Sequence, residues 1–489
     1  MKDLNRTTAG IDKKLPLKVL QFGEGNFLRG FVNYIIDKLN TEANFNAGVV
    51  VVQPIAHGMV NMINDQDGLY TLFLKGLRNG QEIEEKRLIT CIEKGVNPYL
   101  EYEEYLKLAV GEDLEFVFSN TTEAGISFDP EDKFNTAPHN SFPAKLTALL
   151  YRRFKHFNGD RDKGLTIIPC ELINNNADNL KEIILKYAKT WELENEFTTW
   201  INGSNSFHNT LVDRIVPGYP KDEINEYQSQ LEYKDNLIVS AEIFLLWVIE
   251  GGDELRKKIP FDKIDENILV IKDMQPYRTR KVSILNGAHT VIVPFSLMFG
   301  NETVKETLDN DFTGKFVKKA VLQEINATLD LPEKELTTFA NDVFDRFRNP
   351  FIKHQLSSIA LNSVSKFKVR VLPSLLAYEE KFSELPVHLT FAFASLIRFY
   401  KGEWKGSMLP VQDDAKLISE FQEIWELNSY REIATQVLGD KEYWDQDLNT
   451  IPGLTESIAK ALNLIETIGI EDGYNEFEST TVSAGKNKN

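Results

Sequence analysis

The chain has 489 residues, of which 42% are hydrophobic and 26% charged, and its formal net charge is −18. This composition is typical of a globular protein with enough residues for two or three domains. The acidic balance argues against a broad nucleic-acid-binding surface, which needs clustered Lys and Arg.

Strands and helices are expected to alternate in the first part of the chain. Four short apolar runs have the composition of buried strands: residues 18–22, 47–52, 114–118 and 165–169. Between them, apolar residues recur at helical spacing, as from Phe27 to Leu39 and from Ala144 to Phe154. This alternation predicts an α/β fold with a mostly parallel sheet. We therefore expect a Rossmann-like, dinucleotide-binding domain over residues 1–272.

The pattern becomes almost entirely helical beyond residue 272. Helical spacing is clearest in four segments: residues 315–329, 386–400, 414–425 and 455–467. We therefore predict a mostly α-helical C-terminal domain over residues 273–489, which binds the substrate and carries catalytic residues.

A glycine-containing loop follows the first predicted strand. Gly23 and Gly25 stand where a strand meets a helix, and such a loop lets the backbone approach a pyrophosphate at the helix N-terminus. The third glycine of G-x-G-x-x-G is replaced by Leu28. On the loop alone, a tight turn without a ligand explains the pattern equally well.

The end of the second predicted strand bears on the choice of cofactor. NAD sites usually have an Asp or Glu here for the ribose, whereas this chain has Gln53, which can form one such hydrogen bond. No Arg follows directly to bind a 2′-phosphate, so the sequence favours NAD over NADP.

The segment from Lys281 to His289 contains three polar residues with catalytic potential. In a helix, Asn286 and His289 are three residues apart, and Lys281 lies about two turns from His289 on a similar face. A lysine whose pKa is lowered by burial to roughly 7–8 can give a proton to an alkoxide and take it back. A solvated lysine, a helix-terminal asparagine and a core histidine are the alternative that spacing alone favours.

Cysteine content and the N-terminal sequence define the expected compartment. Cys91 and Cys170 are too few for a disulfide framework and lack the spacing of a metal site. The first residues lack the apolar core of a signal peptide, and the longest apolar run, residues 243–249, is too short to span a bilayer. We expect a cytoplasmic enzyme without a metal, a nucleic-acid partner or a membrane partner.

Several motifs, in order from residue 18 to about 373, resemble the long-chain mannitol dehydrogenase family. They are Gly23, Gly25, Phe27 and Arg29 of the first loop; Gln66–Leu72; Thr122–Gly125; Cys170, Glu171, Ile173 and Asn176; Val212–Pro217; Lys281, Asn286 and His289; Asn349–Pro350; and Ser365–Lys366 with Leu372–Pro373. The resemblance implies a metal-independent oxidoreductase with NAD as its cofactor.

The resemblance also implies roles for individual residues. Lys281 is expected to be the general acid/base, and His289 to contact the substrate. Asn176 and Asn286 are expected to stabilise the oxyanion. Because Asn174 and Asn175 are adjacent to Asn176, either of them can take its place in this assignment. Substrate contacts are expected from the following residues: Asp213, Lys366, Glu123 and Arg370. Cofactor contacts are expected from another set: Gly23, Gly25, Asn26, Phe27, Arg29, Gln53, Ser119 and Asn120.

Within the family, three segments resemble the tagaturonate-reducing subgroup: Leu20–Arg29, Pro169–Asn174 and His354–Lys366. Ser358 stands where polyol dehydrogenases usually have an Arg, so a polyol-type contact is not assumed. The cation that holds a substrate carboxylate stays open between Lys366, Arg370 and Arg214. Fructuronate reduction, a mannitol-type activity and a non-catalytic NAD-binding regulator remain alternatives, and the chain is expected to be a monomer or a small homo-oligomer.

Overall fold

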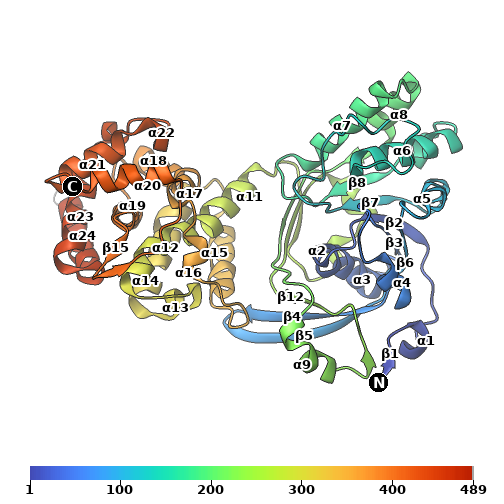
Figure 1. Cartoon of the computed structure of the whole chain (residues 1–489), viewed down its shortest axis with the longest axis horizontal. Helices are drawn as coiled ribbons and strands as arrows, with labels where there is room; N and C mark the ends of the chain where they lie inside the picture. The colour runs from blue at the N-terminus through green and yellow to red at the C-terminus, as the bar shows by residue number, and fades with distance from the viewer. Residues whose placement is uncertain (487–489) are drawn as a thin grey trace. The chain divides into compact units, whose positions relative to one another are not determined.

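A six-stranded parallel sheet forms the centre of the N-terminal part of the computed structural model, which describes residues 1–486 (Figure 1). Its order is β6–β3–β2–β7–β8–β9. The strands are β2 (Leu17–Phe22), β3 (Gly48–Val52), β6 (Ile92–Val96), β7 (Phe116–Ser119), β8 (Thr166–Pro169) and β9 (Ser206–Phe207). Numbered by their own succession along the chain they run 3-2-1-4-5-6, the order of dinucleotide-binding Rossmann folds.

Both faces of this sheet are buried, which explains why its strands are continuous apolar runs. Val49 and Val51 pack into one core with helix α3 (Val32–Glu42), whereas Val50 and Val52 pack into another. The second core is completed by three helices: α6 (Phe142–His156), α7 (Asn176–Thr190) and α8 (Asn195–Ser204). The predicted α/β fold with a parallel sheet is confirmed.

Three small sheets complete the N-terminal part, and one of them has only two strands, β1 (Lys2–Asp3) and β11 (Tyr233–Lys234). The other two have three strands each. One has the order β10–β13–β14, and the other β12–β4–β5. Their strands are β10 (Thr210–Asp213), β13 (Leu246–Glu250), β14 (Ile268–Ile271), β12 (Val239–Glu242), β4 (Tyr70–Arg78) and β5 (Gln81–Ile89).

The single helix expected from Phe27 to Leu39 is two helices in the structure. Helix α2 (Asn26–Gly30) ends at Phe31, whose φ of −126° and ψ of −80° are not helical, and α3 begins directly after it. The prediction of one helix was wrong because apolar spacing does not detect a break in the backbone at one residue.

The C-terminal part is helical and is built around two apolar helices. These are α12 (Gly287–Phe299) and α19 (Val387–Phe399), whose residues are buried on nearly all sides. The other long helices are α14 (Asp311–Lys319), α15 (Glu333–Phe347), α17 (Ser363–Arg370), α18 (Leu372–Phe382), α20 (Ala415–Ile424), α21 (Tyr430–Gly439), α23 (Leu454–Ile468) and α24 (Ile470–Lys486). The predicted helical C-terminal region is confirmed, although residues 315–329 divide into α14, the π-helix η6 (Ala320–Ile325) and the short η7 (Asn326–Thr328).

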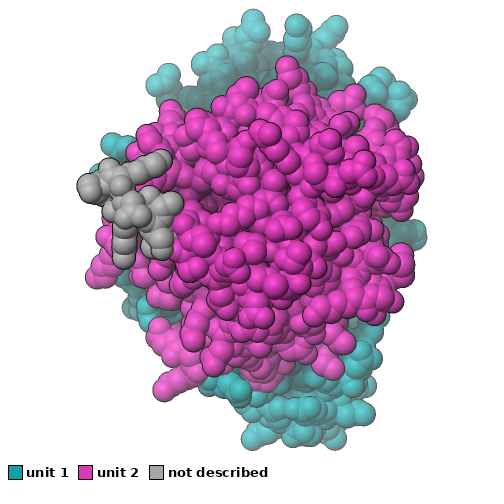
Figure 2. Space-filling view, turned by 90° about the vertical axis from the view of Figure 1, so that its left-hand side faces the viewer, with its two compact units in different colours: residues 1–75, 82–274 teal, residues 76–81, 275–489 magenta. Residues whose placement is uncertain are grey.

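The chain forms two compact units, coloured separately in Figure 2. The first contains residues 1–75 and 82–274, and the second residues 76–81 and 275–489. The turn of the β4–β5 hairpin therefore belongs to the second unit, where the Gly80 N–H donates to Asp345 Oδ2 at 3.1 Å. The functions assigned to residues 1–272 and 273–489 stay predictions.

One helical stretch, Gln275–Phe299, is long and apolar enough to cross a membrane by length and composition alone. In the structure, 72% of its most apolar window is buried, as in the core helix of a folded domain. This stretch was not found from the sequence, because only uninterrupted apolar runs were considered and polar residues divide it into shorter ones.

Candidate functional site

The strand order of the first unit reverses between β2 and β7, and the predicted nucleotide residues lie at that point. In open α/β sheets, ligands bind outside the carboxyl ends of the strands where the order reverses. Gly23 directly follows β2, and Ser119 ends β7, its neighbour in the sheet. The Asn120 N–H donates to Phe22 O at 3.1 Å, so the two strand ends are hydrogen-bonded to each other.

The two glycines of the loop differ in their surroundings. Gly23 has a φ of +117°, and a Cβ there would lie 2.9 Å from Asn120 O and 3.1 Å from Leu28 Cδ1. Gly25 is exposed, precedes helix α2 and has no atom within 4 Å of the position of an added Cβ. Gly23 is thus needed for the turn, whereas Gly25 leaves space at a helix start that no side chain caps, an arrangement that fits a dinucleotide pyrophosphate.

A buried glutamate that the sequence analysis did not assign to the site holds the loop after β7. Glu171 is 2% exposed and accepts hydrogen bonds from Ser119 Oγ at 3.0 Å and from the Thr121 N–H at 2.9 Å. Burial raises the pKa of Glu171, and these hydrogen bonds oppose the rise. Its place in the motif after Cys170 was the available signal. Ser119 Oγ is therefore engaged within the fold, as is Asn120 Nδ2, which donates to Cys170 O at 2.6 Å.

Arg29 stabilises the loop from inside. Its guanidinium is 1% exposed and donates to Glu24 O, Leu237 O and Asn26 Oδ1, the last two at 2.8 and 2.6 Å. Burial lowers its pKa. The structure thus gives Arg29 and its acceptor Asn26 a role in shaping the loop, in contrast to the cofactor contact predicted for them.

Phe27 and Gln53 are also engaged within the protein. The Phe27 ring stacks on Phe31 with centroids 5.0 Å apart. Gln53 is 2% exposed, and its Nε2 donates to Ile55 O at 2.9 Å and to Ala56 O at 3.2 Å. Gln53 orders the loop after β3, and the ribose contact predicted for it stays a prediction.

The amide predicted to stabilise the oxyanion, Asn176, is inaccessible. Asn176 is 0% exposed; its Nδ2 donates to Pro169 O, Glu171 O and Thr210 Oγ1 at 3.1 Å each. Its Oδ1 accepts the Thr210 N–H at 3.0 Å. In this geometry Asn176 joins strand ends, and its predicted part in stabilising the oxyanion stays a prediction.

The neighbours of Asn176 are placed differently. Asn174 and Asn175 are exposed on the same turn, and Asn175 has a left-handed backbone with φ of +51°. The assignment therefore stays open between Asn176 and these two residues.

Three other predicted residues of the first unit have distinct environments. Asp213 ends β10 and is 9% exposed, and Glu123 is exposed in the turn after β7. Arg214 is 5% exposed and donates to Glu242 O at 2.9 Å and to Gly30 O at 2.8 Å. Burial lowers its pKa. Because Arg214 holds the backbone of the core, the structure does not support it as the cation for a substrate carboxylate.

In the second unit, Lys281 and Asn286 are the two ends of a π-helix, η5 (Lys281–Asn286). In an α-helix, residues five apart point about 140° away from each other. The i→i+5 repeat of a π-helix instead stacks them on one face. A regular helix was expected here, and it would have turned Lys281 and Asn286 away from each other. The π-helix turns them toward the same side. Such π-turns are frequent at functional sites.

His289 lies one turn beyond η5, in helix α12, among aromatic and basic side chains. Its ring stacks on Phe347 with centroids 4.2 Å apart, and the ring of His354 lies 5.0 Å away at 75°. Its Nε2 is buried and has no hydrogen-bond partner among the described residues. Burial lowers the pKa of His289 well below its usual value, and four basic neighbours add to the effect: His354, Arg346, Arg370 and Lys366.

Lys366 and Arg370 belong to helix α17, which approaches the start of α12. A Cβ at Gly287 would lie 3.1 Å from Arg370 O, so the glycine after Asn286 permits this close approach. Lys366 Nζ donates to Ile359 O at 2.9 Å. Burial lowers the pKa of both residues. The structure thus brings Asn286, His289, Lys366 and Arg370 into neighbouring segments of one unit.

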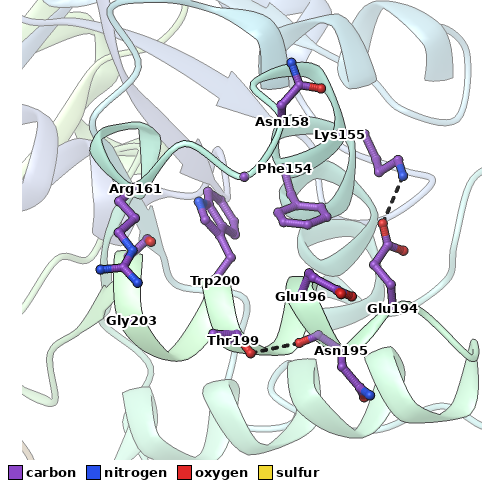
Figure 3. A pocket seen from close by; sticks show the side chains of 12 residues that line it. Phe154, Lys155, Asn158, Arg161, Glu194, Asn195, Glu196, Thr199, Trp200 and Gly203 are labelled. Carbon is purple, nitrogen blue, oxygen red and sulfur yellow. Dashed lines mark hydrogen bonds and ion pairs between the residues drawn. The ribbon is translucent and has the colours of Figure 1, made fainter.

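A hollow of about 850 Å³ lies elsewhere in the first unit (Figure 3). It is lined by the end of α6, by η2 (Arg161–Lys163) and by α8, with Phe154 and Trp200 inside it. Since α6 and η2 precede β8, this hollow is near the amino edge of the sheet, and none of the residues predicted to be functional line it.

Family models match both parts of the chain. The mannitol dehydrogenase Rossmann domain matches residues 17–263, and the mannitol dehydrogenase C-terminal domain matches residues 273–466. The chain belongs to the mannitol dehydrogenase family. As predicted, this member of the family is an oxidoreductase that acts on CH–OH groups.

Curated relatives and solved structures agree with this assignment. Altronate oxidoreductases of Escherichia coli O7:K1 and of Shigella flexneri are each 48% identical over 478 residues, covering 96% of this chain and 99% of the relative. A substrate-free D-sorbitol dehydrogenase has the same fold with a TM-score of 0.79 and 19% identity, over 96% of this chain and 100% of the other. The Pseudomonas fluorescens mannitol 2-dehydrogenase ternary complex with NAD and D-mannitol has a TM-score of 0.63 and 18% sequence identity. The match covers 98% of this chain and 100% of the other.

Ser358 and the absence of a metal cluster complete the description of the site. Ser358 is exposed and its hydroxyl donates to Gln355 O at 2.8 Å. Within residues 1–486, no group of three or more His, Cys, Asp or Glu is arranged to hold a metal ion.

Proposed function

We propose that the chain catalyses the NAD-dependent, reversible reduction of tagaturonate to altronate, in hexuronate catabolism. The observation that carries this proposal is the 48% identity, over nearly the full length, to proteins named altronate oxidoreductase. Lys281, Asn286 and His289, the residues that the chemistry requires, are all present.

The cofactor of the proposed reaction is NAD. Gly23 and Gly25 provide the backbone turn and the open helix start that a pyrophosphate needs, in a Rossmann sheet of the matching strand order. Bound NAD supplies the chemistry of hydride transfer at the sugar carbon.

The chain's own residues manage the proton and the developing charge. Lys281 Nζ gives a proton to the oxygen of the reduced carbonyl and takes one from the hydroxyl in the reverse direction. Asn286, on the same face of η5, donates a hydrogen bond to that oxygen. No metal ion takes part in the proposed mechanism.

The substrate is tested by comparing kcat/KM for NADH oxidation with tagaturonate, fructuronate and fructose. The proposal expects tagaturonate to be preferred at least tenfold. A preference for fructuronate or for fructose would identify the sister activity instead, and no turnover of any of them, with NADH still bound, would favour the non-catalytic regulator.

The role of Lys281 is tested by Lys281→Met. Loss of a general acid lowers kcat by about 10²–10⁴-fold, whereas NADH binding, followed by fluorescence, stays unchanged. Lys305→Met is the matched control, because Lys305 is exposed and pairs only with Asp309 at 2.5 Å among the described contacts. Near-normal turnover by Lys281→Met would refute the assignment. A cytoplasmic location and a monomeric or small homo-oligomeric state stay predictions.

A further inference from the structure

The basic residues around His289 form a group that the reduction itself does not require. Proton transfer and oxyanion stabilisation use Lys281 and neutral amide donors, so additional cations serve another part of the substrate. Resting on the proposed function, we infer that Arg370, Lys366 and His354 bind the carboxylate of the sugar acid beside His289. We name this group the carboxylate cluster; it distinguishes a keto sugar acid from a neutral keto sugar.

The buried Nε2 of His289 is the first observation. A buried polar nitrogen without a partner costs free energy unless a ligand completes its hydrogen bond. Stacking on Phe347 at 4.2 Å fixes the plane of the ring and therefore the direction in which this nitrogen points. The position of His289 is thus prepared for a hydrogen-bond partner that no residue in the described part of the chain provides.

The charge around His289 is the second observation. The groups that lower its pKa through charge are all basic, and they include Arg346 in addition to the carboxylate cluster. A concentration of positive charge in a protein of net charge −18 favours an anionic ligand. Burial also lowers the pKa of His354, so the positive charge comes from Arg370, Lys366 and Arg346, and the ring of His354 can offer a hydrogen bond.

Arg370 is the member best placed to bind the anion. It is half-buried at the end of α17, whose backbone lies against Gly287, and no hydrogen bond or ion pair engages its guanidinium within the described part of the chain. A guanidinium binds a carboxylate through two parallel hydrogen bonds. Lys366 lies one turn earlier on the same helix. Its ammonium group donates one hydrogen bond to Ile359 O, which leaves two N–H donors for a ligand.

Lys281 and the carboxylate cluster lie at separate places in the second unit. Lys281 begins the π-helix η5, whereas His289 lies eight residues further on, in α12. Their side chains therefore serve different atoms of one molecule: Lys281 the oxygen that reacts, and the carboxylate cluster the far end of the carbon chain.

The test compares a keto acid with its neutral counterpart. We would measure kcat/KM for tagaturonate and fructuronate, and for the 2-ketohexoses in which the carboxylate is a hydroxymethyl group. Arg370→Gln is expected to lower kcat/KM for the acids by about 100-fold while changing that for the neutral sugars less than threefold. His354→Phe, which keeps the ring but loses the donor, is expected to lower the acid value by about tenfold.

Two variants control for charge and folding. Lys368→Gln removes one positive charge from the same helix, where Lys368 pairs with Asp445 at 2.7 Å, and should leave the ratio of acid to neutral turnover unchanged. Arg370→Lys keeps the charge and should recover part of the ratio. Each variant is first checked for wild-type Tm and NADH binding.

The outcomes separate the two claims. If Arg370→Gln lowers turnover of acids and neutral sugars equally, or lowers neither, the carboxylate assignment is overturned while the proposed function stands. If the wild-type protein reduces neutral ketohexoses but neither keto acid, the proposed function fails, and the carboxylate cluster fails with it.

Discussion

The two loop glycines allow a paired test of the nucleotide site, with one alanine substitution at each. Gly23→Ala places a Cβ 2.9 Å from the backbone oxygen of Asn120, at a φ of +117° that an alanine rarely adopts. Strain of this kind costs about 1–3 kcal/mol, and the contact with an oxygen that β7 holds in place adds about 1 kcal/mol. We expect unfolding free energy to fall by roughly 2–4 kcal/mol, which lowers Tm by about 4–12 °C in a domain of this size.

Gly25→Ala is the matched partner, because the same methyl group enters open space. Gly25 has a φ of −65° and no atom within 4 Å of the added Cβ, so Tm should fall by less than about 3 °C, the cost of a poorer N-cap. If a pyrophosphate lies against this glycine, KM for NADH rises at least tenfold while the fold is kept.

Differential scanning calorimetry and steady-state kinetics on both variants measure these effects. The reasoning is refuted if Gly25→Ala binds NADH normally, since the open space would then not be the phosphate site. It is refuted in its structural part if Gly23→Ala has the wild-type Tm.

Three further predictions concern stability and metal dependence. Glu324 accepts hydrogen bonds from the backbone N–H groups of His388 and Leu389, each at 2.8 Å, and from His388 Nδ1 at 2.5 Å. Glu324→Ala should therefore lower the free energy of unfolding, measured in urea, by about 3 kcal/mol. A decrease of less than about 1 kcal/mol would contradict this. Burial lowers the pKa of Lys145 to about 8, opposed by Asp132. Because the unfolded chain then holds a proton that the folded chain lacks, stability should rise between pH 8 and 10.5 by about 2–3 kcal/mol relative to Lys145→Met; a pH-independent difference would argue against a lowered pKa. Overnight treatment with EDTA should leave turnover within twofold of the untreated enzyme, and a loss that added Zn²⁺ or Mg²⁺ restores would show that the mechanism needs a metal.

Sequence reasoning was sufficient where the pattern reports local geometry. Runs such as Val49–Val52 are apolar at every position because both faces of the sheet are covered, and this alone predicts a parallel α/β sheet. The glycines after β2 and the polar residues after β7 were found because such residues are needed where strands end.

A sequence does not show which polar groups are already satisfied within the fold. Arg29, Gln53 and Asn176 have the residue types of ligand contacts, yet each is buried and uses its donors on backbone oxygens of distant or neighbouring segments. Only the folded chain reveals these partners.

What the sequence determined by itself is therefore a parallel α/β sheet followed by a helical C-terminal region, since both follow from periodicity. Tertiary structure alone decided that Lys281 and Asn286 share a face, through a π-helix that periodicity does not encode. It also decided that His289 lies beside Phe347 and near His354 and Arg370, residues more than fifty positions further along the chain. The physical reason is that burial and charge at a site are sums over neighbours in space, and packing, which chooses those neighbours, depends on the whole fold.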